Sequence, residues 1–152
     1  MKKLKPYIIG VGAGVLMYVA IFAIFHPFVV SGPSMEPTFY DQNFVLSEKI
    51  ETKLGYGDVV IANMGGKRCI KRVVALPGDS VRIEGGVLYV NGAASEYNYA
   101  VIEDAGLLAH EVTLFKDEYV LLGDNRNNSL DSRDYGPVKR ENILYRVTKK
   151  II

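Results

Sequence analysis

Residues 80–90, SVRIEGGVLYV, have the sequence signature of a β-hairpin. Two short runs rich in Val, Ile and Tyr are separated by two glycines, and β-branched and aromatic side chains suit a pleated, half-buried surface. Both glycines can adopt the positive φ angles that a tight hairpin turn requires. An Asn-Gly pair ends the second run with another turn signal. The segment therefore predicts two antiparallel strands, Ser80–Ile83 and Val87–Val90.

Runs of the same kind recur along most of the remaining chain. Residues 137–142 alone indicate a helical turn, and residues 93–110 have weak periodicity, which predicts a long surface excursion. Many short strands with frequent turns are typical of an all-β domain. We therefore predict a mainly β fold, with antiparallel sheets forming one compact domain. The other predicted strands are Phe44–Leu46, Val59–Ala62, Cys69–Ala75, Glu111–Leu114, Tyr119–Leu122 and Ile143–Val147.

The first 26 residues predict one N-terminal transmembrane helix. Residues 7–25 are uncharged and mostly apolar, and as a helix they would span about 28 Å, close to the roughly 30 Å core of a bilayer. Pro27 removes a backbone donor and disfavours helix at the residue before it. These features predict a cytoplasmic N-terminus at residues 1–6, an anchor at 7–26 and an extracytoplasmic domain at 27–152.

Two other interpretations of this segment compete with the anchor. A cleaved signal peptide has a shorter apolar core followed by a small-x-small site, and no such site follows here. A buried helix of a soluble domain would normally show a polar stripe. Three lysines precede the segment and none lies between it and Lys49, so the positive-inside rule places the domain outside the cytoplasm.

Composition argues against several other functions. The chain has 152 residues and a formal net charge of +1, without a basic tract beyond the N-terminus, so we expect no nucleic-acid partner. The single cysteine, Cys69, permits no disulfide framework within one chain. No cluster of His, Cys, Asp and Glu has the spacing of metal ligands, so we expect neither a metal nor a cofactor. We expect a monomer.

Ser34 is a candidate nucleophile. It lies in the run SGPSMEPT, residues 31–38, where Pro33 and Pro37 stiffen the turn and Gly32 allows close approach of another chain. A hydroxyl on a rigid turn is one way to pre-organise a nucleophile. The alternative is an ordinary exposed loop serine, because serine is frequent in turns.

Lys71 is the candidate base for this serine. A lysine must be desolvated to serve as a base near neutral pH, since free lysine titrates near 10.4. Lys71 lies in the longest strand-like run, where Cys69 and Val73 would share its face. The alternative is a solvent-facing strand lysine. His110 remains a second candidate for the base.

Four motifs in this order resemble those of type I signal peptidases, and the resemblance covers nearly the whole chain. They are Ser31–Thr38, Gly57–Val60, Ile70–Asp79 and Gly123–Gly136. The single predicted anchor and the short catalytic region are similar to the Gram-positive branch. The resemblance implies a membrane-bound serine endopeptidase that removes signal peptides from secretory preproteins.

The resemblance also implies roles for individual residues. Ser34 would be the nucleophile and Lys71 the general base, Ser129 would orient the lysine, and Asp131 and Arg133 would form a structural ion pair. Some family members carry a serine where this chain has Gly32, and that serine donates a hydrogen bond to the oxyanion. The candidates for lining the substrate pockets are Met35, Cys69 and Ile70.

Two rival functions remain at the level of the sequence. Self-cleaving repressor-like proteins also use serine and lysine, but they carry a DNA-binding domain where this chain has its apolar segment. A catalytically inactive, membrane-tethered β-domain that binds precursors or partners is the other. An activity assay distinguishes the inactive domain from the peptidase.

Overall fold

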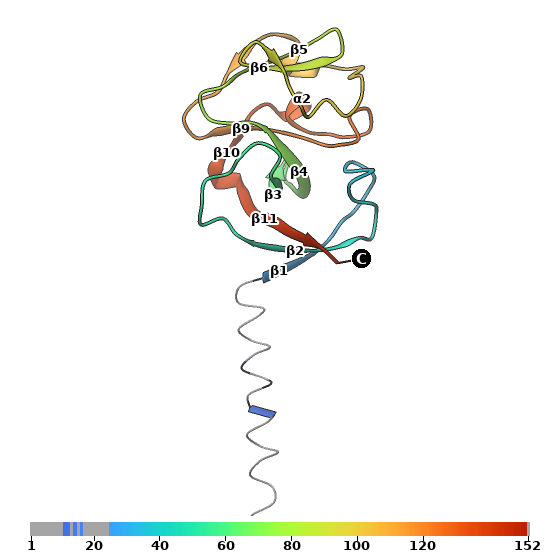
Figure 1. Cartoon of the computed structure of the whole chain (residues 1–152), viewed down its shortest axis with the longest axis vertical. Coiled ribbons are helices and arrows are strands. Elements are labelled where there is room, and N and C mark those ends of the chain that lie inside the picture. The colour runs from blue at the N-terminus through green and yellow to red at the C-terminus, as the bar shows by residue number, and fades with distance from the viewer. Residues whose placement is uncertain (1–10, 13, 15, 17–24, 152) are drawn as a thin grey trace, which may run out of the picture.

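The computed structural model describes residues 11, 12, 14, 16 and 25–151. Strands dominate the part from residue 25 onward, and helical turns are short (Figure 1). The strands are β1 Phe25–Val29, β2 Phe44–Lys49, β3 Val59–Met64, β4 Lys67–Ala75, β5 Ser80–Glu84, β6 Val87–Val90, β7 Ala93–Ala94, β8 Val112–Thr113, β9 Glu118–Leu122, β10 Val138–Lys139 and β11 Ile143–Lys150. The helical turns are η1 Gly106–Ala109, α2 Ser132–Tyr135 and η2 Arg140–Asn142.

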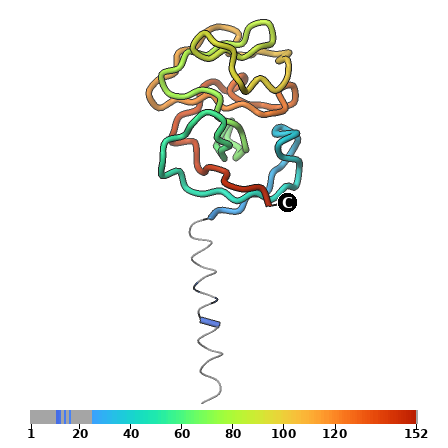
Figure 2. Tube along the Cα trace, viewed as in Figure 1, coloured from blue at the N-terminus to red at the C-terminus, as the bar shows by residue number. Residues whose placement is uncertain are grey.

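The strands form two antiparallel sheets. The larger sheet has the order β1-β2-β11-β3-β4-β9-β10, and the smaller one has the order β7-β6-β5-β8. In Figure 2 the first strand, in blue, and the last strand, in red, lie at the same end of the larger sheet, because both pair with β2. The predicted mainly β, antiparallel fold is confirmed, and the hairpin at residues 80–90 pairs Glu84 with Val87 across its two glycines.

Three hydrophobic clusters fill the domain. One joins the smaller sheet to the ends of β4 and β9, and a second lies between β3, β4, β9 and β11. The third packs the segment after β1 against β2 and β4, with Val30, Met35, Phe39, Val45 and Ile70 at its centre. Met35 is fully buried, so this cluster holds the turn that follows Gly32 against the sheet.

Strand β1 begins at Phe25, so Phe25 and His26, which the sequence assigns to the end of the anchor, pair with β2 instead. The His26 ring packs against Tyr145 in a tilted arrangement, with ring centroids 4.3 Å apart. Pro27 fits because β1 is an edge strand, where a missing backbone donor is tolerated. The rest of the predicted anchor lies almost entirely outside the described residues, and none of the described helices is long and apolar enough to cross a bilayer.

The predicted surface excursion at residues 93–110 is more closely packed than its sequence suggests. It contains β7 and η1, and its Ile102 and Leu108 are buried in the first cluster. Its backbone also accepts hydrogen bonds from the loop after β9, where Arg126 donates to the carbonyl of Tyr97, and from α2, where Arg133 donates to the carbonyl of Asp104. The segment therefore forms a wall beside that loop. The predicted strand Glu111–Leu114 shortens to β8.

Candidate active site

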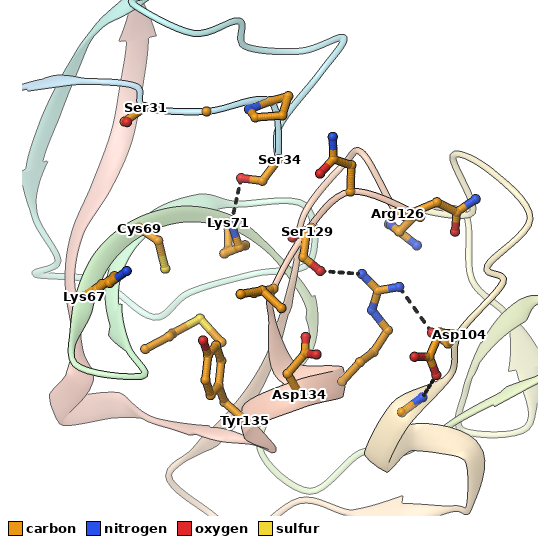
Figure 3. Close-up of a pocket in the computed structure, with 18 of the residues that line it drawn as sticks. Ser31, Ser34, Lys67, Cys69, Lys71, Asp104, Arg126, Ser129, Asp134 and Tyr135 are labelled. Carbon is orange, nitrogen blue, oxygen red and sulfur yellow. Dashed lines mark hydrogen bonds between the residues drawn. The ribbon is translucent and has the colours of Figure 1, made fainter.

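Ser34 and Lys71 meet at the surface of the larger sheet. Ser34 lies on the turn after β1, and Lys71 lies in the middle of β4, 37 residues further along the chain. The Nζ atom of Lys71 is 2.8 Å from Oγ of Ser34 (Figure 3). This is the hydrogen-bond distance that a nucleophile and its base require.

Lys71 is desolvated by its position in the sheet. Only 2% of the residue is exposed, and its Nζ also donates to the carbonyl of Ile70 at 3.0 Å. Burial lowers the pKa of Lys71, since the charged amine loses its hydration, while Cys69, Asp131 and Asp124 oppose that shift. A lowered pKa gives the neutral amine that can accept a proton from Ser34.

The turn at residues 31–38, the nucleophile turn, carries the candidate nucleophile Ser34. Hydrogen bonds fix it from both sides. Gly32 has φ of 84°, a conformation that favours glycine, and its N–H donates to Oδ1 of Asp41 at 2.7 Å. On the other side, Asn125 donates its backbone N–H to the carbonyl of Ser34 at 3.1 Å and its side-chain amide to that of Pro33 at 3.2 Å. The Gly32 N–H is therefore already engaged.

An ion pair that the sequence analysis missed connects three segments of the site. Arg72 Nε donates to Oδ1 of Asp124 at 2.8 Å and its Nη2 donates to Oδ2 at 2.6 Å. Thr38 Oγ1 also donates to Oδ2 of Asp124, at 2.6 Å. The Asp124 carboxylate is fully buried, so it ties the nucleophile turn, β4 and the loop after β9 together. The available signal was an arginine next to Lys71 in the run Cys69–Ala75, whose other side chains are apolar.

The loop between β9 and α2 is organised by Asp131 and Arg133. Both oxygens of the buried Asp131 carboxylate accept from Arg133, from Nε and Nη2 at 2.8 Å each. Asp131 also accepts from the N–H of Gly123 at 3.0 Å and caps α2 in a capping box with Asp134. These contacts hold the loop that carries Ser129. The Oγ of Ser129 is buried and has no hydrogen-bond partner among the described residues.

The dyad opens into a cavity of about 680 Å³. Its lining includes the charged side chains of Lys67, Arg68, Glu103 and Asp104 and the larger, less polar side chains of Met64, Leu130 and Tyr135. Figure 3 shows Lys67, Asp134 and Tyr135 around the cavity.

The predicted pocket residues separate into two groups. Cys69 lines the cavity beside Lys71, and its Sγ donates to the carbonyl of Ala62 at 3.6 Å. Met35 and Ile70 are buried in the third hydrophobic cluster, on the other side of β4. Strand alternation explains the difference, since Ile70 points away from the face that carries Cys69 and Lys71.

Within the described part of the chain, no other residue that the sequence offers as a base or nucleophile replaces this pair. His110 is exposed at the end of η1, whereas Lys71, the other candidate base, contacts Ser34. Burial raises the pKa of the Cys69 thiol, which disfavours a thiolate nucleophile at this position. Within residues 25–151 and the four described residues before them, no group of His, Cys, Asp and Glu could hold a metal ion.

Known signal peptidases are similar in sequence to this chain. The family model described as signal peptidase, peptidase S26 matches residues 5–151. Signal peptidase I of Bacillus amyloliquefaciens is 34% identical, with 86% of this chain and 75% of the relative covered. Signal peptidase I V of Bacillus subtilis (strain 168) is 32% identical, with 95% and 96% covered.

A solved structure of the same family also resembles this chain. The crystal structure of a signal peptidase I from Enterococcus faecalis V583 superposes with a TM-score of 0.51 at 28% identity, covering 64% of this chain and 98% of that one. Similarity in sequence therefore extends over residues 5–151, and similarity in fold over 64% of the chain. The chain belongs to the signal peptidase family, peptidase S26.

Proposed function

We propose that Ser34 and Lys71 carry out the reaction of this family, the removal of signal peptides from secretory preproteins by a serine endopeptidase. The observation that supports these roles is the 2.8 Å distance between Lys71 Nζ and Ser34 Oγ, with the lysine buried. Neutral Lys71 takes the proton of Ser34 as Oγ attacks the scissile carbonyl. The resulting ammonium then protonates the leaving amine, and the bond between the two parts of the precursor breaks.

Hydrolysis of the acyl-enzyme completes the cycle. Lys71, neutral again after the amine departs, takes a proton from water as the water attacks the ester carbonyl. Ser34 then leaves with that proton, and the signal peptide is released with a new carboxylate.

The oxyanion that forms in both steps needs donors. The Ser34 N–H is the donor we assign, because the Gly32 N–H is held by Asp41 and Pro33 has no N–H.

Three further residues support the dyad in this proposal. Ser129 orients the Lys71 amine, and its buried hydroxyl, without a partner among the described residues, is available for that contact. Asp131 and Arg133 fix the loop that carries Ser129. Cys69 borders the subsites for the small residues before the cut, where it lines the cavity next to Lys71.

We also propose that the enzyme is a single-pass protein of the cell membrane. Residues 7–24, which precede β1, anchor it, the N-terminus is cytoplasmic, and the catalytic domain works as a monomer at the outer face of the bilayer. The uncharged run after three lysines supports this topology. A short linker from the anchor to Ser34 keeps the dyad near the bilayer, where secretory precursors present their cleavage sites. Protease treatment of sealed vesicles tests the topology: residues 27–152 should be digested only from the outer side.

The inactive binding domain is the alternative function. It has no support from the comparisons, and it leaves the contact between a buried lysine and a serine unexplained.

Cleavage of a purified precursor, followed by mass spectrometry of both products, separates the two functions. The peptidase predicts one cut after a small-x-small sequence and no cut by Ser34→Ala. Binding of the precursor without cleavage by the wild type would favour the inactive domain.

A further inference from the structure

A second cavity lies between the nucleophile turn and the loop after β9, and both contribute to its lining. It has a volume of about 330 Å³ and is lined by Glu36, Tyr40, Tyr99, Asn125, Arg126 and Asn127 among others. It shares Arg126 and Asn127 with the main cavity. The nucleophile turn passes from one cavity to the other, since residues 31–34 line the first, and residues 36 and 37 line the second.

A peptide cut by Ser34 needs one site for the residues before the scissile bond and another for the residues after it. The lining of the main cavity includes Met64, Leu130 and Tyr135, which suit the apolar side chains that precede the cut. The second cavity has polar and aromatic walls, which suit the more polar start of a mature protein. We propose that the second cavity binds the first residues of the mature protein, those that follow the cut. This inference rests on the proposed function.

Arg126 supplies a hydrogen-bond donor for the residues that follow the cut. It is 1% exposed, and its Nε and Nη2 donate to the carbonyls of Gly123 and Tyr97. Its Nη1 is buried and has no partner among the described residues. A buried donor without an acceptor is unfavourable, and a backbone carbonyl of an extended peptide between the two cavities would satisfy it.

Tyr99 lines the second cavity, and contacts with two arginines fix the position of its ring. The guanidinium carbons of Arg72 and Arg126 each lie 5.3 Å from the centroid of its ring, so cation–π contacts with two residues hold it in place. Tyr40, which also lines this cavity, is contacted by Lys150 at 5.5 Å.

Glu36 sets the charge preference of this cavity. Asp124 is neutralised by Arg72, and the Arg126 guanidinium keeps its charge but is only 1% exposed and donates to two backbone carbonyls. The Glu36 carboxylate is half-exposed and makes neither a hydrogen bond nor an ion pair within the described residues. A basic side chain at the second or third mature position therefore binds better than an acidic one. Exposed ion pairs of this kind change rates by about two- to fivefold, and less at high salt.

Kinetics with matched precursors test this inference. One precursor is made in three forms, with Lys, Gln or Glu at the second and third mature positions and an unchanged signal peptide. The full-length enzyme in detergent is compared with Glu36→Gln, Glu36→Lys and Tyr99→Ala. The control is Glu84→Gln, which removes the same charge from an exposed carboxylate on the smaller sheet.

Wild type and Glu84→Gln should cleave the Lys form about two- to fivefold faster than the Glu form, measured as kcat/KM at low salt. Glu36→Gln should remove that preference, and Glu36→Lys should reverse it. Tyr99→Ala should lower kcat/KM for all three forms, chiefly by raising KM.

Equal cleavage of the three forms by wild type and by Glu36→Lys would overturn the inference while leaving the peptidase function standing. Failure of the wild type to cut any form would overturn both.

Discussion

Replacing Gly123 by alanine should disable the enzyme without unfolding it. Gly123 is buried at the end of β9, and its N–H donates to Asp131. A Cβ atom built at this position would lie 2.5 Å from the carbonyl oxygen of Ser34 and would also overlap the Ser129 side chain. The alanine therefore presses on two residues of the site at once.

The size of the effect follows from that distance. Ordinary van der Waals contact begins near 3.4 Å, so the Ser34 carbonyl must move by roughly 0.9 Å. A displacement of about 1 Å in a reacting group costs on the order of 100-fold in rate, which corresponds to about 2.7 kcal/mol of barrier. Overpacking of this kind costs about 1–3 kcal/mol of stability, which a folded domain can tolerate.

The assay is kcat/KM on a purified precursor, with thermal unfolding measured on the same samples. Gly55→Ala is the matched control, because a Cβ there meets nothing within 4 Å and its φ is not positive. We expect a loss of about 100-fold for Gly123→Ala and near wild-type activity for Gly55→Ala. Full activity of Gly123→Ala would show that the Ser34 turn does not pack against this glycine during catalysis.

Three further predictions follow from the surroundings of the dyad. Burial lowers the pKa of Lys71, and only the neutral amine accepts a proton, so kcat/KM should rise with pH through that lowered pKa. If kcat/KM instead rose only near the ordinary lysine pKa of about 10.4, the base would not be desolvated. Arg133→Met leaves the Asp131 carboxylate buried without its ion pair, so urea unfolding should show a loss of about 3–5 kcal/mol, and a loss below about 1 kcal/mol would refute the buried pair. Labelling Cys69 with a bulky maleimide should block cleavage, whereas full activity after stoichiometric labelling would place the thiol away from the substrate.

Most of the sheet could be predicted from local sequence, because alternating apolar side chains and glycine turns specify strands over a few residues. The hairpin at residues 80–90 is the clearest example. Strand β1 was not predicted, since Phe25–Val29 contains a proline and continues the apolar N-terminal run. Strand β10 has only two residues, which is too short for any periodicity.

Site residues that belong to sequence motifs could be predicted, whereas contacts between residues far apart in the sequence could not. The motifs placed Ser34 and Lys71 together, and the structure sets them 2.8 Å apart. The pairing of Arg72 with Asp124 joins residues 52 positions apart, which no local pattern reveals. Arg126 was visible as a motif residue, but only the fold shows that its guanidinium is buried between two cavities.

The most direct test of the dyad is a comparison of kcat/KM for wild type, Ser34→Ala, Lys71→Met and the double variant on one precursor. Residues that act as a unit show strongly non-additive effects. We expect each single variant to lose essentially all cleavage while remaining folded, and the double variant to be no worse than either. Substantial activity in Lys71→Met would contradict the assignment of Lys71 as the general base of Ser34.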